Sequence, residues 1–237
     1  MMSTFARDRV SQSFLDNVYG RIARRYDLVN SLQSFGMAGF VRRNAARFIN
    51  RGVVLDIGAG SGDLAAACLA AGARRVVCLD RSPEMFEVAR RKLARYERAG
   101  RVVFVLGDVT RLPFRNGVFD GAGSAFVFRN IPDVETALRE VRRVTREDGR
   151  VAMVDVFAPP SGLVGLGYKL YLNVMVPLWG YLVARDREAY QYLSSSIQRC
   201  FSGADLARGL TAAGFELARA EPKFLGVAHV VKAQPSR

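Results

Sequence analysis

Residues 54–62 read Val-Leu-Asp-Ile-Gly-Ala-Gly-Ser-Gly, an apolar run that carries Asp56 and passes into three alternating glycines. An apolar run followed by a glycine-rich turn is typical of a buried strand that opens into a tight loop and then a helix. Glycine suits such a loop because the backbone must bend sharply and let a ligand approach with no Cβ in the way. The pattern therefore predicts a strand, a loop containing Gly58, Gly60 and Gly62, and a helix.

A second apolar run, residues 76–79, ends at Asp80. In doubly wound folds, a carboxylate at the tip of the strand beside the glycine loop holds the two hydroxyls of a ribose. We therefore predict that Asp56, the loop, Asp80 and the adjoining Arg81 bind a nucleoside cofactor.

The glycine spacing bears on the kind of cofactor. The dinucleotide fingerprint is G-x-G-x-x-G, in which a helix N-terminus meets a pyrophosphate. Here the third glycine comes one residue early, and Asp63 occupies the fingerprint position. An acidic residue at a helix N-terminus would repel a pyrophosphate. The spacing favours a cationic or uncharged nucleoside ligand; NAD binding and a plain strand-turn-helix corner with a solvated acid remain the alternatives.

Strands and helices are expected to alternate from residue 53 onwards. Strands are expected at residues 53–57, 75–79, 102–106, 119–125 and 150–157, and helices at residues 61–71, 83–96 and 133–146. A short helix at 204–213 precedes two late strands, at 215–218 and 227–231, which indicate a hairpin at the sheet edge. The chain is thus expected to be an α/β protein with a doubly wound, seven-stranded, mainly parallel sheet and a C-terminal β-hairpin.

An apolar segment, residues 163–184, interrupts this pattern. The segment is long enough for a transmembrane helix, but Lys169, Asn173 and Pro177 argue against one. A lid over an apolar substrate or a segment on a membrane face fits better, and a helical insertion that packs on the core is the alternative. We expect an N-terminal helical cap at residues 1–50 and a main domain at 51–237, with an apolar helical insertion at 161–200.

The composition limits the compartment and the partners. Of 237 residues, 35 are basic and 22 acidic, for a net charge of +13. A basic surface favours anionic membranes or RNA, although a genome-wide preference for arginine would give the same balance. Three widely spaced cysteines and a single histidine, His229, argue against a metal site or a disulfide framework. With no apolar leader in the first residues, we expect a reduced, cytoplasmic compartment and no metal ion.

Residues 126–130 read Phe-Val-Phe-Arg-Asn and follow the fourth expected strand, at the edge where ligands bind. A buried guanidinium is costly unless it is paired, so Arg129 needs a carboxylate or a substrate oxygen. Phe126 and Phe128 are candidates to wall an aromatic ring.

Several motifs together resemble a known family, the ubiquinone/menaquinone biosynthesis C-methyltransferases (the demethylmenaquinone methyltransferase or UbiE type) within the class I S-adenosylmethionine-dependent methyltransferases. The resemblance runs in order along residues 14–232. It is carried by Tyr26-Asp27-Leu28-Val29-Asn30, Ser34-Phe35-Gly36, Gly60-Ser61-Gly62-Asp63-Leu64, Leu112-Pro113-Phe114, Phe128-Arg129-Asn130, Tyr190-Gln191-Tyr192-Leu193 and Ala213-Gly214-Phe215.

The resemblance assigns roles to positions in this chain. It implies S-adenosyl-L-methionine as the cofactor, with contacts at Ser61, Asp80, Asp108, Val109 and Ala125, the last in place of the family's usual serine. It implies that Tyr26, Arg129 and Asn130 lie near the reacting ring.

The implied activity is methylation of a ring carbon of a polyprenylated quinol. Arg129 would stabilise the oxyanion of the ring, and Tyr26 and Asn130 would hold the ring or a water. The expected partners are a lipophilic quinol, an anionic membrane surface at the inner face and, as an open option, a second copy of the chain; no nucleic acid is expected. Two alternatives remain: a methyltransferase for another lipid or small molecule, and a regulatory cofactor-binding or RNA-binding protein without turnover.

Overall fold

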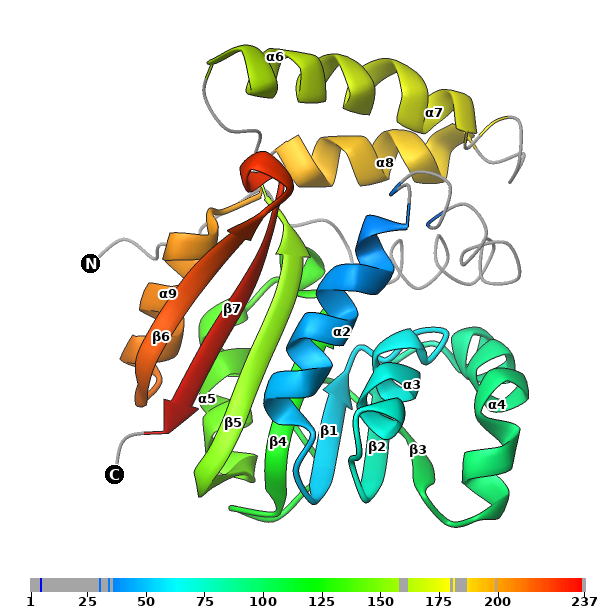
Figure 1. Ribbon diagram of the computed structural model, residues 1–237, viewed down its shortest axis with the longest axis vertical. Coiled ribbons are helices and arrows are strands. Elements are labelled where there is room, and N and C mark those ends of the chain that lie inside the picture. Colours follow the sequence, from blue (N-terminus) through cyan, green and yellow to red (C-terminus); the bar gives the residue numbers. More distant parts are fainter. Residues whose placement is uncertain are drawn as a thin grey trace.

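The computed structural model describes residues 5, 30, 34, 36–157, 162–179, 181, 187–198 and 200–235. Within them, seven strands form one sheet in the order β3-β2-β1-β4-β5-β7-β6 (Figure 1). The strands are β1 (Val53–Ile57), β2 (Arg75–Asp80), β3 (Val102–Leu106), β4 (Phe119–Ala125), β5 (Thr145–Val156), β6 (Phe215–Lys223) and β7 (Ala228–Pro235). The first five are parallel, and β7 pairs antiparallel with β5 and β6. The predicted doubly wound sheet with a C-terminal hairpin is confirmed.

Helices cover both faces of the sheet and bury two separate apolar clusters (Figure 1). One face carries α2 (Met37–Ile49), α3 (Asp63–Ala70) and α4 (Pro83–Arg98), and the other carries α5 (Val134–Val144) and α9 (Gly203–Ala212). The helix α2 lies within the range expected for an N-terminal cap, and its apolar residues pack into the core of the first face.

The helix α5 shows how the sequence dictates this layering. Its apolar stripe is buried as the spacing predicts, and the side chain of Asp133 accepts the backbone N–H of Thr136 at 2.9 Å, which caps the helix.

Some boundaries differ from those expected. The helix expected to reach residue 146 ends at Val144, because Thr145 is already extended and pairs with Phe119 of β4. Both strands of the hairpin are longer than expected and continue to Lys223 and Pro235. The strand β6 is a largely exposed edge strand, so polar residues extend it where the sequence shows no apolar run.

The insertion lies beyond the sheet. It contains α6 (Gly162–Leu170), the π-helical turn η2 (Tyr171–Met175), α7 (Val176–Trp179) and α8 (Arg187–Gln198). Figure 1 shows α6 and α7 across the top of the molecule, with α8 between them and the sheet. Among the described residues, no helix has the length and apolar character needed to cross a membrane.

Candidate functional site

The glycine loop after β1 requires glycine at two positions for different reasons. Gly58 has a φ of +62°, and a Cβ there would lie 2.5 Å from Cγ2 of Val127. Gly62 has a φ of +81° at the start of α3, and a Cβ there would lie 2.8 Å from Cδ1 of Leu93 in α4. Gly58 therefore permits contact with the segment after β4, and Gly62 permits the packing of two helices.

Asp80 ends β2 and anchors this loop. Its Oδ2 accepts the backbone N–H of Gly60 at 2.7 Å, and its Oδ1 accepts that of Ser82 at 2.9 Å. The structure thus places Asp80 directly beside the glycine loop, as expected from the sequence.

Asp56 lies in β1 below the same loop and is almost completely buried. Neither of its carboxylate oxygens has a side-chain hydrogen-bond partner among the described residues. Burial raises the pKa of Asp56 from 3.8 to about 8; the Asp80 carboxylate adds to the rise, and the Ala65 backbone N–H and Arg42 oppose it. At neutral pH this side chain is therefore mostly protonated, and a cation in front of it would favour its ionised form.

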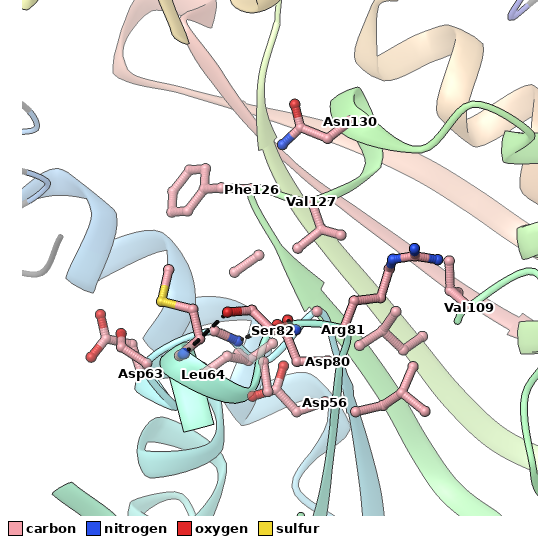
Figure 2. Close-up of a pocket in the computed structure, with 18 of the residues that line it drawn as sticks. Asp56, Asp63, Leu64, Asp80, Arg81, Ser82, Val109, Phe126, Val127 and Asn130 are labelled. Atoms are coloured by element: carbon pink, nitrogen blue, oxygen red, sulfur yellow. Dashed lines mark hydrogen bonds between the residues drawn. The ribbon is translucent and has the colours of Figure 1, made fainter. Parts of the chain in front are cut away.

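These groups line one cleft at the carboxyl ends of the strands, shown in Figure 2. Of the residues predicted from the sequence, those that line the cleft are Asp56, Gly58, Gly60, Ser61, Asp80, Arg81, Val109, Ala125 and Asn130. Figure 2 shows Asp80 near the middle, with Val109 on one side and Asp63 on the other.

Asp108 is placed differently from this set. Its Oδ1 accepts hydrogen bonds from the backbone N–H and the hydroxyl of Thr110, and its Oδ2 pairs with Nη1 of Arg81. These contacts hold the pKa of Asp108 below its usual value although partial burial opposes them. Asp108 does not line the cleft among the described residues, whereas its partner Arg81 does.

Arg129 is buried at the end of β4 and has the carboxylate partner that its burial requires. Its Nη1 lies 2.6 Å from Oδ1 of Asp155, and its backbone N–H is donated to Oδ2 of the same residue at 3.2 Å. Burial raises the pKa of Asp155, and the Arg129 guanidinium opposes the rise. Asp155 lies near the end of β5, so neighbouring strands supply the two halves of this ion pair.

The insertion reaches the same region. The hydroxyl of Tyr192 in α8 lies 3.2 Å from Oδ1 of Asn130 and donates to it. Tyr168 of α6 is half-buried, and this burial raises its pKa; it lies close enough to Arg129 for the guanidinium to oppose that rise. Tyr26, the third residue expected near the ring, lies outside the described residues.

Asp63 carries less uncompensated charge than the sequence suggests. It forms ion pairs with Arg42 at 3.1 Å and with Lys92. The expectation that Asp63 would repel an anionic ligand is corrected accordingly, because two cations neutralise it.

The two phenylalanines expected to wall a ring have different positions. Phe126 lines the cleft and has a φ of +66°, a left-handed conformation that is rare for a large side chain. Phe128 is buried in the core, so the expectation for this residue is wrong. The cause is the short helical turn η1 (Phe128–Asn130), which turns Phe128 inward.

Three residues of this region were missed as site residues by the reasoning from sequence: Asp155, Arg42 and Tyr192. Asp155 had the clearest signal, because it interrupts the apolar run Val154-Asp155-Val156 near a strand end, as Asp56 does in its own strand. Tyr192 was part of a matching motif without an assigned role. Arg42 is one member of an arginine pair and had no signal of its own.

Known proteins share this fold. The structure of a SAM-dependent methyltransferase from Thermotoga maritima matches with a TM-score of 0.65 at 18% identity, covering 93% of this chain and 99% of that one. The mitomycin 7-O-methyltransferase MmcR matches with a TM-score of 0.59 at 21% identity, covering 92% of this chain and 60% of that one. At these identities the likeness shows the class I methyltransferase fold.

Relatives found by sequence are more similar to this chain than these structures are. The demethylmenaquinone methyltransferase of Thermus thermophilus is 38% identical over 218 residues, covering 90% of this chain and 97% of the relative. The demethylmenaquinone methyltransferase of Thermotoga maritima is 34% identical, covering 90% and 92%. The ubiquinone/menaquinone biosynthesis C-methyltransferase UbiE of Hahella chejuensis is 35% identical, covering 79% and 77%.

The family description "ubiE/COQ5 methyltransferase family" matches residues 7–233, nearly the whole chain. This chain is therefore a SAM-dependent methyltransferase that belongs to the ubiE/COQ5 methyltransferase family.

Proposed function

We propose that this enzyme transfers the methyl group of S-adenosyl-L-methionine to a ring carbon of a polyprenylated quinol in menaquinone or ubiquinone biosynthesis. The observation that carries the proposal is the buried ion pair of Arg129 and Asp155. The next residue after Arg129 in the chain is Asn130, which lines the wall of the cleft. The printed names of the relatives support the same substrate class.

The residues of the cleft fit S-adenosyl-L-methionine. Gly58 keeps the wall beside Val127 free of a side chain, and the buried carboxyl of Asp56 suits a positively charged ligand. We assign Asp80 to the ribose hydroxyls and the wall at Arg81 and Val109 to the adenine, with Ser61 and Ala125 lining the space between. When bound, this cofactor supplies an electrophilic methyl group on a sulfonium.

Arg129 would act on the acceptor. Only 3% of its side chain is exposed, and in so dry a setting a fixed positive charge stabilises a nearby oxyanion far more than it does in water. We propose that Arg129 holds the ring oxygen of the quinol in its deprotonated form, which makes the adjacent ring carbon nucleophilic. Asn130, held by Tyr192, would position the ring, and the proton displaced from the carbon would pass to water.

The insertion offers a surface for contact with lipid. Leu163, Leu166 and Leu170 lie on one face of α6, and all three are exposed. An exposed apolar face on a protein of net charge +13 fits the surface of an anionic membrane. We propose that α6 rests on the inner face of the membrane, where a lipophilic quinol is available.

A partition assay tests the proposal. Purified protein is mixed with S-adenosyl-L-methionine labelled in the methyl group and, separately, with a prenylated naphthoquinol, a prenylated benzoquinol or phosphatidylethanolamine in detergent. We expect label in a quinol. The oxidised quinone is the matched control and should take up none, because its ring carbon is not nucleophilic.

Label in phosphatidylethanolamine alone would indicate another lipid methyltransferase. No transfer to either quinol by a protein that binds the cofactor would contradict the proposal.

A further inference from the structure

Arg42 is a buried arginine of α2 that lines the cleft described above. Only 10% of its side chain is exposed. Its Nη1 lies 3.1 Å from Oδ2 of Asp63, and its guanidinium carbon lies 5.0 Å from the centre of the Phe126 ring. Contacts on both sides therefore fix the guanidinium in one orientation.

One polar edge of this guanidinium is unused. The Nε of Arg42 is buried and has no hydrogen-bond partner among the described residues. A buried donor without a partner is costly, and the cost is larger when the group is charged. A carboxylate is the natural partner, because it accepts two parallel hydrogen bonds from the edge of a guanidinium.

The position of Arg42 in the cleft decides which part of the cofactor it can meet. Its partners Asp63 and Phe126 lie away from Val109 in Figure 2, with Asp80 between them. If the nucleoside lies between Asp80 and Val109, the rest of the ligand must extend towards Asp63. For S-adenosyl-L-methionine, this remaining part is an amino acid with one ammonium and one carboxylate group.

The charges at this end match such a zwitterion. Asp56 lines the cleft there and suits an ammonium group. Asp63 is paired with Lys92 as well as with Arg42, so it does not take up the whole charge of Arg42. Among the described lining residues, Arg42 and Arg81 carry the positive charges, and Arg81 is paired with Asp108 on the nucleoside side. Arg42 is thus the cation placed for a carboxylate at the amino-acid end.

We propose that Arg42 binds the α-carboxylate of the methionine moiety of the cofactor and thereby selects ligands that carry it. This assignment rests on the proposed use of S-adenosyl-L-methionine in the cleft. The strained backbone of Phe126 serves the same purpose, since it holds the ring against the guanidinium.

Binding calorimetry with three ligands tests the assignment. S-adenosyl-L-methionine has the complete tail, its decarboxylated analogue lacks only the carboxylate, and 5′-methylthioadenosine lacks the whole amino-acid group. The wild-type protein should bind the complete cofactor about 10- to 100-fold more tightly than the decarboxylated analogue, as expected for hydrogen bonds between charged groups. Equal affinities would overturn the assignment without any variant.

The variant Arg42→Gln should lose this preference. Its affinity for the complete cofactor should fall about 10- to 100-fold, while affinity for the decarboxylated analogue changes less than about 3-fold. Unchanged binding of 5′-methylthioadenosine would show that the cleft is intact. A preference that survives in Arg42→Gln would overturn the assignment, and so would an equal loss for all three ligands.

Two further variants serve as controls. Arg43→Gln removes the neighbouring, exposed arginine of α2 and should leave all three affinities unchanged. Arg42→Lys keeps the charge and should retain part of the preference. A wild-type protein that binds none of the three ligands would instead refute the proposed cofactor, so the two failures are distinguishable.

Discussion

Nη1 of Arg129 lies 2.6 Å from Oδ1 of Asp155, and the two side chains expose 3% and 1% of their surface. Asp155 also accepts the backbone N–H of Arg129, so one carboxylate fixes both the main chain and the guanidinium at the end of β4. Such a pair is costly to bury and costly to break, since removal of one partner leaves a buried charge.

Asp155→Asn should therefore affect both turnover and stability. We expect the free energy of unfolding in urea to fall by about 3 kcal/mol. Turnover should fall about 100-fold, because Arg129 would lose the carboxylate that fixes its guanidinium where the oxyanion of the ring would form, with cofactor affinity nearly unchanged. Asp148→Asn is the control, because Asp148 is exposed and lies 3.5 Å from Arg146; it should change stability by less than about 1 kcal/mol. Full turnover by Asp155→Asn would remove this ion pair from the mechanism.

Asp80→Asn tests the ribose assignment. The asparagine keeps the size of the side chain but loses the charge and one acceptor, so calorimetry should show a cofactor affinity about 10- to 100-fold lower. Asp120→Asn is the matched control: Asp120 accepts the backbone N–H of Val53 at 2.8 Å, at the opposite end of β1. Equal affinity in the two variants would contradict the assignment.

Gly58→Ala separates backbone strain from the loss of space in the cleft. Gly58 and Gly117 have φ values of +62° and +60°, but a Cβ at Gly117 would meet nothing within 4 Å. Gly117→Ala should cost about 1–2 kcal/mol of unfolding free energy, the penalty of the left-handed conformation. Gly58→Ala should cost more and also weaken cofactor binding, and Val127→Ala in the same chain should restore part of both. Identical effects of the two glycine variants would show that contact with Val127 is unimportant.

The pH dependence of stability should report on Asp56. Its pKa is about 8 in the folded protein, against the ordinary value of 3.8 that we take for the unfolded chain. Between these two pH values the folded state holds a proton that the unfolded state has released. Raising the pH through this window therefore destabilises the protein, by up to about 1.4 kcal/mol per pH unit from this residue, and the effect ends above about pH 8. Urea unfolding of wild type and Asp56→Asn at several pH values should show a flatter profile for the variant. Parallel profiles would mean that Asp56 titrates normally.

Vesicle binding tests the proposed membrane contact. Replacing Leu163, Leu166 and Leu170 of α6 with serine should lower binding to vesicles that contain phosphatidylglycerol, while turnover of a detergent-solubilised quinol is retained. Leu217→Ser changes an exposed leucine of β6 and should have no effect. Added salt should weaken binding of the wild type, because salt screens the attraction between a basic protein and anionic lipid. Binding that resists both changes would place the contact elsewhere.

The sequence predicted the sheet and the cofactor half of the site well because both depend on local signals. Asp56 and Asp80 interrupt apolar strands at their carboxyl ends, and parallel strands bring such residues to one edge. The ion pair of Arg129 was anticipated as a requirement, but its partner was not identified. Asp155 is 26 residues away, and only the pairing of β4 with β5 brings the two together.

Other features depend on packing that no local pattern reveals. Arg42 reaches the cleft because α2 lies across the sheet next to α3, and its neighbour Arg43 is exposed to solvent. Phe126 and Phe128 look alike in the sequence, yet the turn η1 places one in the cleft and the other in the core.

The most direct test of the account is the fate of the methyl group in a single turnover. The protein is loaded with S-adenosyl-L-methionine carrying a ¹³C-labelled methyl and mixed with a reduced prenylated quinol that lacks the ring methyl, and the product is examined by ¹³C NMR. We expect one labelled methyl bound to a ring carbon. A label on a ring oxygen, or an unchanged quinol beside intact cofactor, would contradict it.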